Sequence, residues 1–126
     1  MEDIKVLVVD DIRIMRRLLI SSLNTLDITG IEQADNATTA LEIFNGSIIH
    51  IVFLDINMPD VSGLELIKQL CSINPDVFII MVSADSSIDN VKKSIALGAK
   101  GFIVKPYSSD RIKFMIDKYK VENQIN

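Results

Sequence analysis

Cysteine and histidine are almost absent from this sequence. Cys71 is the only cysteine among 126 residues, so no disulfide can form within the chain, which suits a reducing compartment. His50 is the only histidine, and a single histidine without neighbouring cysteines does not make a zinc site. We therefore interpret Cys71 as part of a helix face without a redox role, and His50 as the start of a strand outside any metal site.

A net positive charge and long hydrophobic runs are lacking as well. The formal net charge is −4 and the pI is about 4.9, which argues against a protein that binds the phosphate backbone of nucleic acids. The longest apolar runs, 51–54 and 77–82, are far shorter than a membrane span. The beginning, MEDIKVLVVDD, has acidic residues where a signal peptide carries positive charge. We expect a cytoplasmic protein that neither inserts into a membrane nor contacts nucleic acid directly.

The sequence does contain a regular alternation of two kinds of segment. With 48% hydrophobic and 24% charged residues its composition is that of a globular protein, and we expect one domain over residues 1–126. The first kind of segment is a continuous, β-branched apolar run, which is typical of a strand covered on both faces. Strands are predicted at 4–9, 49–54, 77–82 and 101–104, with a weaker edge strand at 29–34.

The second kind of segment has the spacing of an amphipathic helix. Helix by helix, the predicted inward residues are Met15, Leu19, Leu23 and Leu26; Ala37, Ala40, Leu41 and Phe44, ending near Gly46; Leu64, Ile67 and Cys71; Ile88, Val91 and Ile95; and, within 109–120, Ile112, Met115, Ile116 and Tyr119. Capping signals support three boundaries. Ser62 with Glu65 and Ser86 with Asp89 resemble capping boxes, and Gly98 can end the fourth helix.

Strand and helix thus alternate five times, which predicts an α/β fold with a parallel sheet and helices on both faces. In such sheets ligands bind at the carboxyl ends of the strands. Asp10 and Asp11 follow the first strand in chain order. Asp55 follows the third strand, Ser83 the fourth and Lys105 the fifth. We therefore expect three carboxylates, a hydroxyl and an ammonium group to meet at one edge of the sheet.

Clustered carboxylates repel one another unless a cation lies among them. Oxygen ligands without nearby cysteine or histidine favour a hard ion, and Mg²⁺ is the ion we expect. Lys105 beside a metal indicates a tetrahedral anion, and a carboxylate can attack phosphorus to form an aspartyl phosphate. Simpler interpretations remain open at this point. Asp10 and Asp11 could cap the following helix, Asp55 could begin a turn, and Ser83 and Lys105 could be ordinary strand-end and surface residues.

The segments that carry these residues resemble a known family. VLVVDD, LDINMPDVSGLEL, SA and KP, in this order and each at the end of a strand, resemble the receiver domain of bacterial two-component response regulators. The likeness covers nearly the whole chain, and through MRRLL and DINMPDVSGLEL it is greatest to the stand-alone chemotaxis regulators of that family. It implies a flavodoxin-like, doubly wound (βα)5 fold with strand order 2-1-3-4-5.

The resemblance also implies roles for the residues of the expected acidic site. Asp55 would be the phosphoacceptor. Mg²⁺ would be held by Asp10, Asp11, Asp55 and the backbone carbonyl of Asn57. Lys105 would pair with the phosphoryl oxygens.

Other positions would transmit the effect of phosphorylation to the rest of the domain. Ser83 matches the hydroxyl residue that takes part in catalysis and switching, and the small Ala84 after it would leave the phosphoryl group accessible. Phe102 falls where the family often carries an aromatic switch residue, although it could equally be an ordinary core residue. Pro106 falls where the family usually has a cis peptide bond. Asp85 stands where the chemotaxis regulators carry glutamate.

The implied function is a phosphorylation-activated signalling switch. The donor would be a histidine kinase or a histidine phosphotransfer protein, and the downstream target would bind the face formed by residues 86–121. Because the output is binding, we expect a non-enzyme that catalyses only its own phosphorylation and dephosphorylation. The chain stops soon after its last predicted helix with no visible linker. This favours a stand-alone regulator over a receiver domain cut from a multidomain transcriptional regulator.

Two other classes of protein fit the sequence less well. An aspartyl-phosphate phosphohydrolase needs a second acid two residues past its nucleophile, where this chain has Asn57. A flavin-binding module of the same topology needs a loop rich in hydroxyl groups and glycine after the first strand, where DDIRIMRR stands instead. A Walker-type glycine loop is also missing from the sequence.

Overall fold

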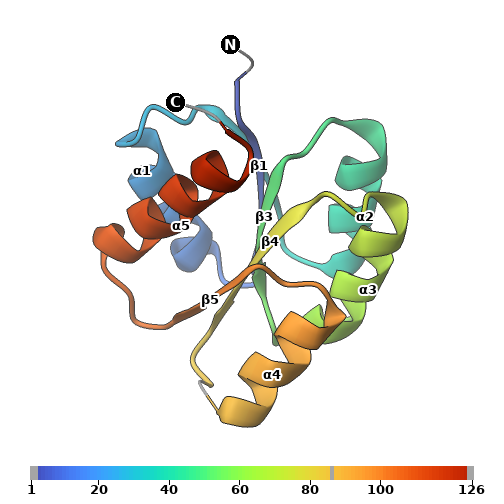
Figure 1. Ribbon diagram of the computed structural model, residues 1–126. Helices are drawn as coiled ribbons and strands as arrows, with labels where there is room; N and C mark the ends of the chain where they lie inside the picture. Colours follow the sequence, from blue (N-terminus) through green and yellow to red (C-terminus); the bar gives the residue numbers. More distant parts are fainter. Residues whose placement is uncertain (1–2, 86, 125–126) are drawn as a thin grey trace.

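Five parallel strands form the central sheet, in the order β2-β1-β3-β4-β5. The computed structural model describes residues 3–85 and 87–124. The strands are β1 (Lys5–Val9), β2 (Gly30–Ala34), β3 (Ile51–Asp55), β4 (Phe78–Ser83) and β5 (Gly101–Val104). The helices are α1 (Arg13–Asn24), α2 (Ala37–Gly46), α3 (Gly63–Ile73), α4 (Ile88–Leu97) and α5 (Ser109–Glu122). Helices α1 and α5 lie on one face of the sheet and α2, α3 and α4 on the other (Figure 1), which confirms the predicted flavodoxin-like fold.

The interior strands are apolar along their length because both of their faces are covered. Every residue of β3 and β4 is buried, as are residues 6–9 of β1. Alternate side chains enter two separate cores: Val8 and Phe53 lie in the core under α1 and α5, and Leu7 and Val52 in the core under α2 and α3. Strand β2 pairs only with β1 and exposes two of its five residues, as expected of an edge strand.

The predicted inward faces of α1, α2 and α5 are confirmed in their main residues. The buried residues are Leu19 and Leu23 on α1; Ala37, Ala40 and Phe44 on α2; and Ile112, Met115, Ile116 and Tyr119 on α5. On α3 the prediction is only partly right, because Leu66 and Leu70 are buried beside Ile67 while Leu64 and Cys71 are half-buried. Ser62 caps α3 through the N–H of Leu64, and Glu65 pairs with Lys68 on the exposed side.

The predicted inward face of α4 is largely wrong, because only Val91 of its three residues is even half-buried. Ile88 and Ile95 are 73% and 57% exposed, and Ser94 is the buried residue of the helix. The apolar spacing correctly showed that these isoleucines share a face, but that face points to solvent. The helix approaches α3 instead through small residues: a Cβ on Gly98, its C-cap with φ of 120°, would lie 2.8 Å from Cys71 Sγ.

The boundaries of α4 agree with the sequence at one end. Gly98 ends the helix as predicted. The predicted cap Ser86 lies outside the described residues, and Ser87 is the N-cap, where its side chain accepts from Asn90 N–H. Among residues 3–85 and 87–124, none of the helices has the length and hydrophobicity to cross a bilayer.

Candidate functional site

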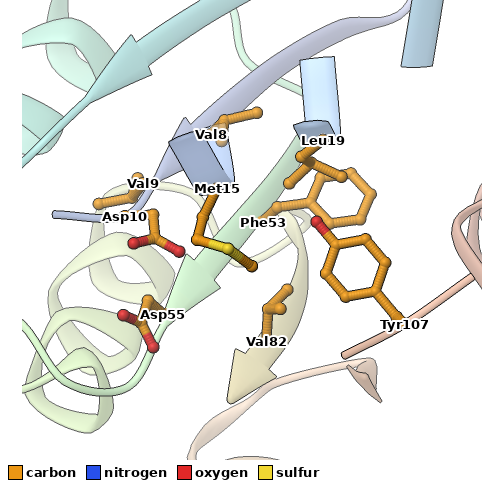
Figure 2. A pocket seen from close by; sticks show the side chains of 9 residues that line it. All are labelled: Val8, Val9, Asp10, Met15, Leu19, Phe53, Asp55, Val82 and Tyr107. Carbon is orange, nitrogen blue, oxygen red and sulfur yellow. The ribbon is translucent and has the colours of Figure 1, made fainter. Parts of the chain in front are cut away.

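Three carboxylates converge at the carboxyl edge of the sheet. Asp10 directly follows β1 and Asp55 is the last residue of β3, and their side chains lie next to each other in Figure 2. Oxygens of Asp10, Asp11 and Asp55 all lie within 4.8 Å of one another. Asp10 and Asp55 are each only 6% exposed, whereas Asp11 is exposed. The predicted meeting of distant acids at one edge is therefore present.

Backbone contacts fix the turn that carries Asp10. Its N–H continues the sheet by donating to Ala34 O at 3.1 Å, and its Oδ1 accepts from Ile12 N–H at 2.9 Å. Arg16, one turn into α1, donates from Nη1 to the carbonyl of Asp10 at 2.8 Å. The N-cap of α1 is Ile12, which makes no side-chain capping bond, so Asp10 and Asp11 are not the N-cap of this helix.

Lys105 supplies the cation of the site. Its Nζ lies 2.8 Å from Asp10 Oδ2 and 3.8 Å from Asp55 Oδ2, and its side chain is 13% exposed. Just past the end of β5, Lys105 N–H donates to Ser83 O at 2.8 Å, which holds its backbone beside β4. The peptide bond between Lys105 and Pro106 is cis, as the resemblance implied. Lys105 is therefore not a surface lysine.

Burial is the main influence on the charge of Asp55. Desolvation raises the pKa of its carboxyl group, the negative charges of Asp10 and Asp11 raise it further, and Lys105 and the N–H of Asn57 lower it. The ammonium group of Lys105 pairs with Asp10 and Asp55, and Asp11 adds a third carboxylate, which leaves an excess of negative charge at the site. An all-oxygen donor set with this charge fits a hard divalent cation such as Mg²⁺.

Ser83 reaches the same edge through strand register. Val82 of β4 pairs with Asp55, and Ser83, one residue further on, pairs with Val104. The Ser83 side chain is fully buried, and its Oγ accepts from Asp85 N–H at 3.0 Å. Phe102 lies deeper in the sheet, where it is half-buried and packs against the core under α2 and α3.

Asp85 is held by the start of α4. Its two carboxylate oxygens accept from Ser87 N–H at 3.0 Å and from Asn90 Nδ2 at 2.9 Å. Together with the bond to Ser83, these contacts connect the edge of the sheet to the first turn of α4.

Comparison with known proteins identifies the family. Residues 6–117 match the sequence profile of the response regulator receiver domain. The chain belongs to the receiver domain family. The chemotaxis protein CheY of Listeria monocytogenes is 35% identical over 115 residues, which are 91% of this receiver and 97% of that protein. The transcriptional regulatory protein MalR of Bacillus subtilis is 30% identical over 97% of this receiver but only 52% of its own length.

Solved structures agree with this family. The chemotaxis protein CheY4 of Vibrio cholerae superposes on this receiver with a TM-score of 0.87 and 25% sequence identity, covering 94% of this chain and 99% of that one. The receiver is thus similar to chemotaxis proteins over nearly their whole length, and also to one part of a longer transcriptional regulator.

Sequence reasoning missed two residues of this receiver site. Tyr107 lines a small cavity of about 10 Å³ beside Asp10 and Asp55, together with Met15 (Figure 2). Such a volume is close to the space of one water. Burial, and then the charge of Asp10, raise the pKa of the Tyr107 hydroxyl. An aromatic residue two positions past Lys105 was the available signal.

Gly63 is the second missed residue. A Cβ at this position would overlap the carbonyl oxygen of Asp55 and lie 2.8 Å from the Cα of Ile56. Its N–H donates to Ile56 O at 2.7 Å, so the chain after the acidic site folds back tightly on β3. Only glycine allows this approach, which a turn-forming segment alone does not reveal.

Proposed function

We propose that this receiver domain is a phosphorylation-activated switch that accepts a phosphoryl group on Asp55. The observation that carries the proposal is the placement of Lys105 Nζ against both Asp10 and Asp55, at an edge where three carboxylates meet. Mg²⁺ would be held by Asp10, Asp11, Asp55 and the backbone carbonyl of Asn57. When bound, the ion supplies positive charge that offsets the charge of the transferring group.

In the proposed reaction, a carboxylate oxygen of Asp55 attacks the phosphorus of a phosphohistidine. The new P–O bond forms as the P–N bond breaks, and the donor imidazole leaves with the electron pair. Lys105 pairs with the phosphoryl oxygens, where its charge is most effective because the site is poorly solvated. The donor would be a histidine kinase or a histidine phosphotransfer protein.

The output follows from Ser83. Its Oγ accepts from Asp85 N–H, and its O–H can donate to a phosphoryl oxygen. If the side chain turned toward that oxygen, the bond to Asp85 would draw the segment after β4 along with it. Asp85 is tied to Asn90, so that movement would reach α4. Phe102 would then turn further inward, and the face formed by residues 86–121, of which 87–121 are described, would prefer a different partner.

The protein would act as a stand-alone cytoplasmic regulator and would be no enzyme beyond its own phosphorylation and dephosphorylation. Coverage of 97% of a CheY chain supports this form. The likeness to half of MalR supports the alternative of a receiver from a transcriptional regulator. Asn57, two residues past Asp55, argues against a phosphohydrolase.

Acetyl phosphate with Mg²⁺ tests the proposal. We expect the unaltered protein to incorporate one phosphoryl group, measured by mass spectrometry, and Asp55→Ala to incorporate none. Asp76→Ala serves as a control because it removes an exposed acid just before β4, outside the cluster. Undiminished labelling of Asp55→Ala would place the acceptor elsewhere.

A further inference from the structure

Asp60 joins two elements that are far apart in the sequence. It lies in the segment between β3 and α3, and its Oδ1 accepts from Ala37 N–H at 3.0 Å and from Val61 N–H at 2.9 Å. Its Oδ2 accepts from the N–H and the hydroxyl of Thr38, both at 3.1 Å. Three of these four donors belong to the first turn of α2.

Helix α2 is therefore capped by two side chains. Asn36 accepts from Thr39 N–H at 2.8 Å, and Asp60 takes the N–H groups of the two residues before it. A carboxylate at this end of a helix is favoured by the free N–H groups and the helix dipole. These bonds, with Ala37 N–H first, lower the pKa of Asp60 to about 2, so it stays charged at physiological pH.

The segment that carries Asp60 has few other polar ties. Among the described residues, 57–61 make no backbone-to-backbone hydrogen bond. The N–H of Asn57 lies 3.4 Å from Asp55 Oδ1, which is long for a hydrogen bond. Asp60 thus supplies the shortest and most numerous polar contacts between this segment and the rest of the fold.

We propose that Asp60 is a positioning residue for the metal site, because it clamps residues 57–61 to α2 and so fixes the backbone of Asn57. The inference rests on the proposed function, in which the carbonyl of Asn57 is a ligand of Mg²⁺. Asp60 itself lies outside the three-carboxylate cluster and acts through the main chain.

The chain offers a matched pair of variants for the test. Asp60→Ala and Asn36→Ala each remove a side-chain cap from α2. Only Asp60 belongs to the segment 57–61, so only its replacement releases that segment from α2. Both variants should lower the melting temperature. In calorimetric titration with MgCl2, Asp60→Ala should bind Mg²⁺ roughly tenfold more weakly than the unaltered protein, which is the lower end of the loss usual when a residue that orients a metal ligand is removed. Asn36→Ala should bind Mg²⁺ like the unaltered protein.

A third variant separates the loss of contacts from a failure to fold. Asp60→Asn keeps one oxygen acceptor in nearly the same shape, so its Mg²⁺ affinity should lie between those of the alanine variant and the unaltered protein. Unchanged affinity in both Asp60 variants, or an equal loss in Asn36→Ala, would overturn the clamp. If the unaltered protein takes up no Mg²⁺, the proposed function fails, and the clamp fails with it.

Discussion

At the scale of single residues, the ion pair of Lys105 with Asp10 is central to the site, because both side chains are largely buried. Its two groups were predicted to meet because they follow strands of one parallel sheet, and the register brings them to 2.8 Å. Asp60 was not predicted, because its partners are backbone N–H groups of a helix 22 positions earlier in the chain. No local pattern in PDVSG predicts such a contact.

Replacing Lys105 by alanine should destabilise the Mg²⁺-free protein by about 3 kcal/mol at pH 7, since buried carboxylates lose their shared cation. Urea denaturation measures this loss. Binding of Mg²⁺ should persist, while acetyl phosphate should no longer change the affinity for a partner. Lys93→Ala is the control: its pair with Asp89 is exposed and should contribute less than about 0.5 kcal/mol. Equal losses in the two variants, or normal switching without Lys105, would contradict the role.

At the scale of elements, the close return of the chain at Gly63 fixes where Asp55 stands. Gly63→Ala should cost about 2 kcal/mol, within the range of overpacking, because the added methyl meets the Asp55 carbonyl, and it should also slow labelling by acetyl phosphate. Gly46→Ala is the control at the end of α2, where a Cβ meets nothing within 4 Å. It should leave stability unchanged or improve it by up to about 1 kcal/mol. Thermal melts of both variants measure these changes in stability.

The elements also show how far periodicity can be trusted. Continuous apolar runs located β1, β3, β4 and β5, and the stripe of α5 was predicted completely. The stripe of α4 was real but faces solvent, because spacing indicates which side chains share a face and not which face packs. The close approach of Gly98 to Cys71, where α4 meets α3, exists only once these two helices are side by side.

At the scale of the whole molecule, the acidic edge makes stability depend on pH and Mg²⁺. The pKa of Asp55 is raised in the folded state, so folding favours its protonated form. The stability that this raised pKa contributes is therefore fully present below the ordinary pKa of about 4 and is lost as the pH rises through the folded-state pKa. Asp60 acts oppositely: its folded-state pKa of about 2 gives stability above pH 4 that is lost as the pH falls toward 2.

Asp55→Asn should accordingly be more stable than the unaltered protein at pH 7 without Mg²⁺, by about 1.4 kcal/mol for each unit by which the pKa of Asp55 is raised. Denaturation in EDTA at pH 4.5 and 7 measures the difference, which should shrink at the lower pH. Saturating Mg²⁺ should reverse the order, since the ion stabilises the form that binds it more tightly. A difference that grows as the pH falls would show that burial does not raise this pKa.

The contact between α3 and α4 has a practical consequence. Cys71 is the sole thiol of the chain, half-buried, with its sulfur where a side chain of residue 98 would stand. A small fluorophore attached to it would therefore sit beside Gly98, the C-cap of α4, and at no other place. Its emission would follow each displacement of that helix directly, without an engineered labelling site and without knowledge of the downstream partner.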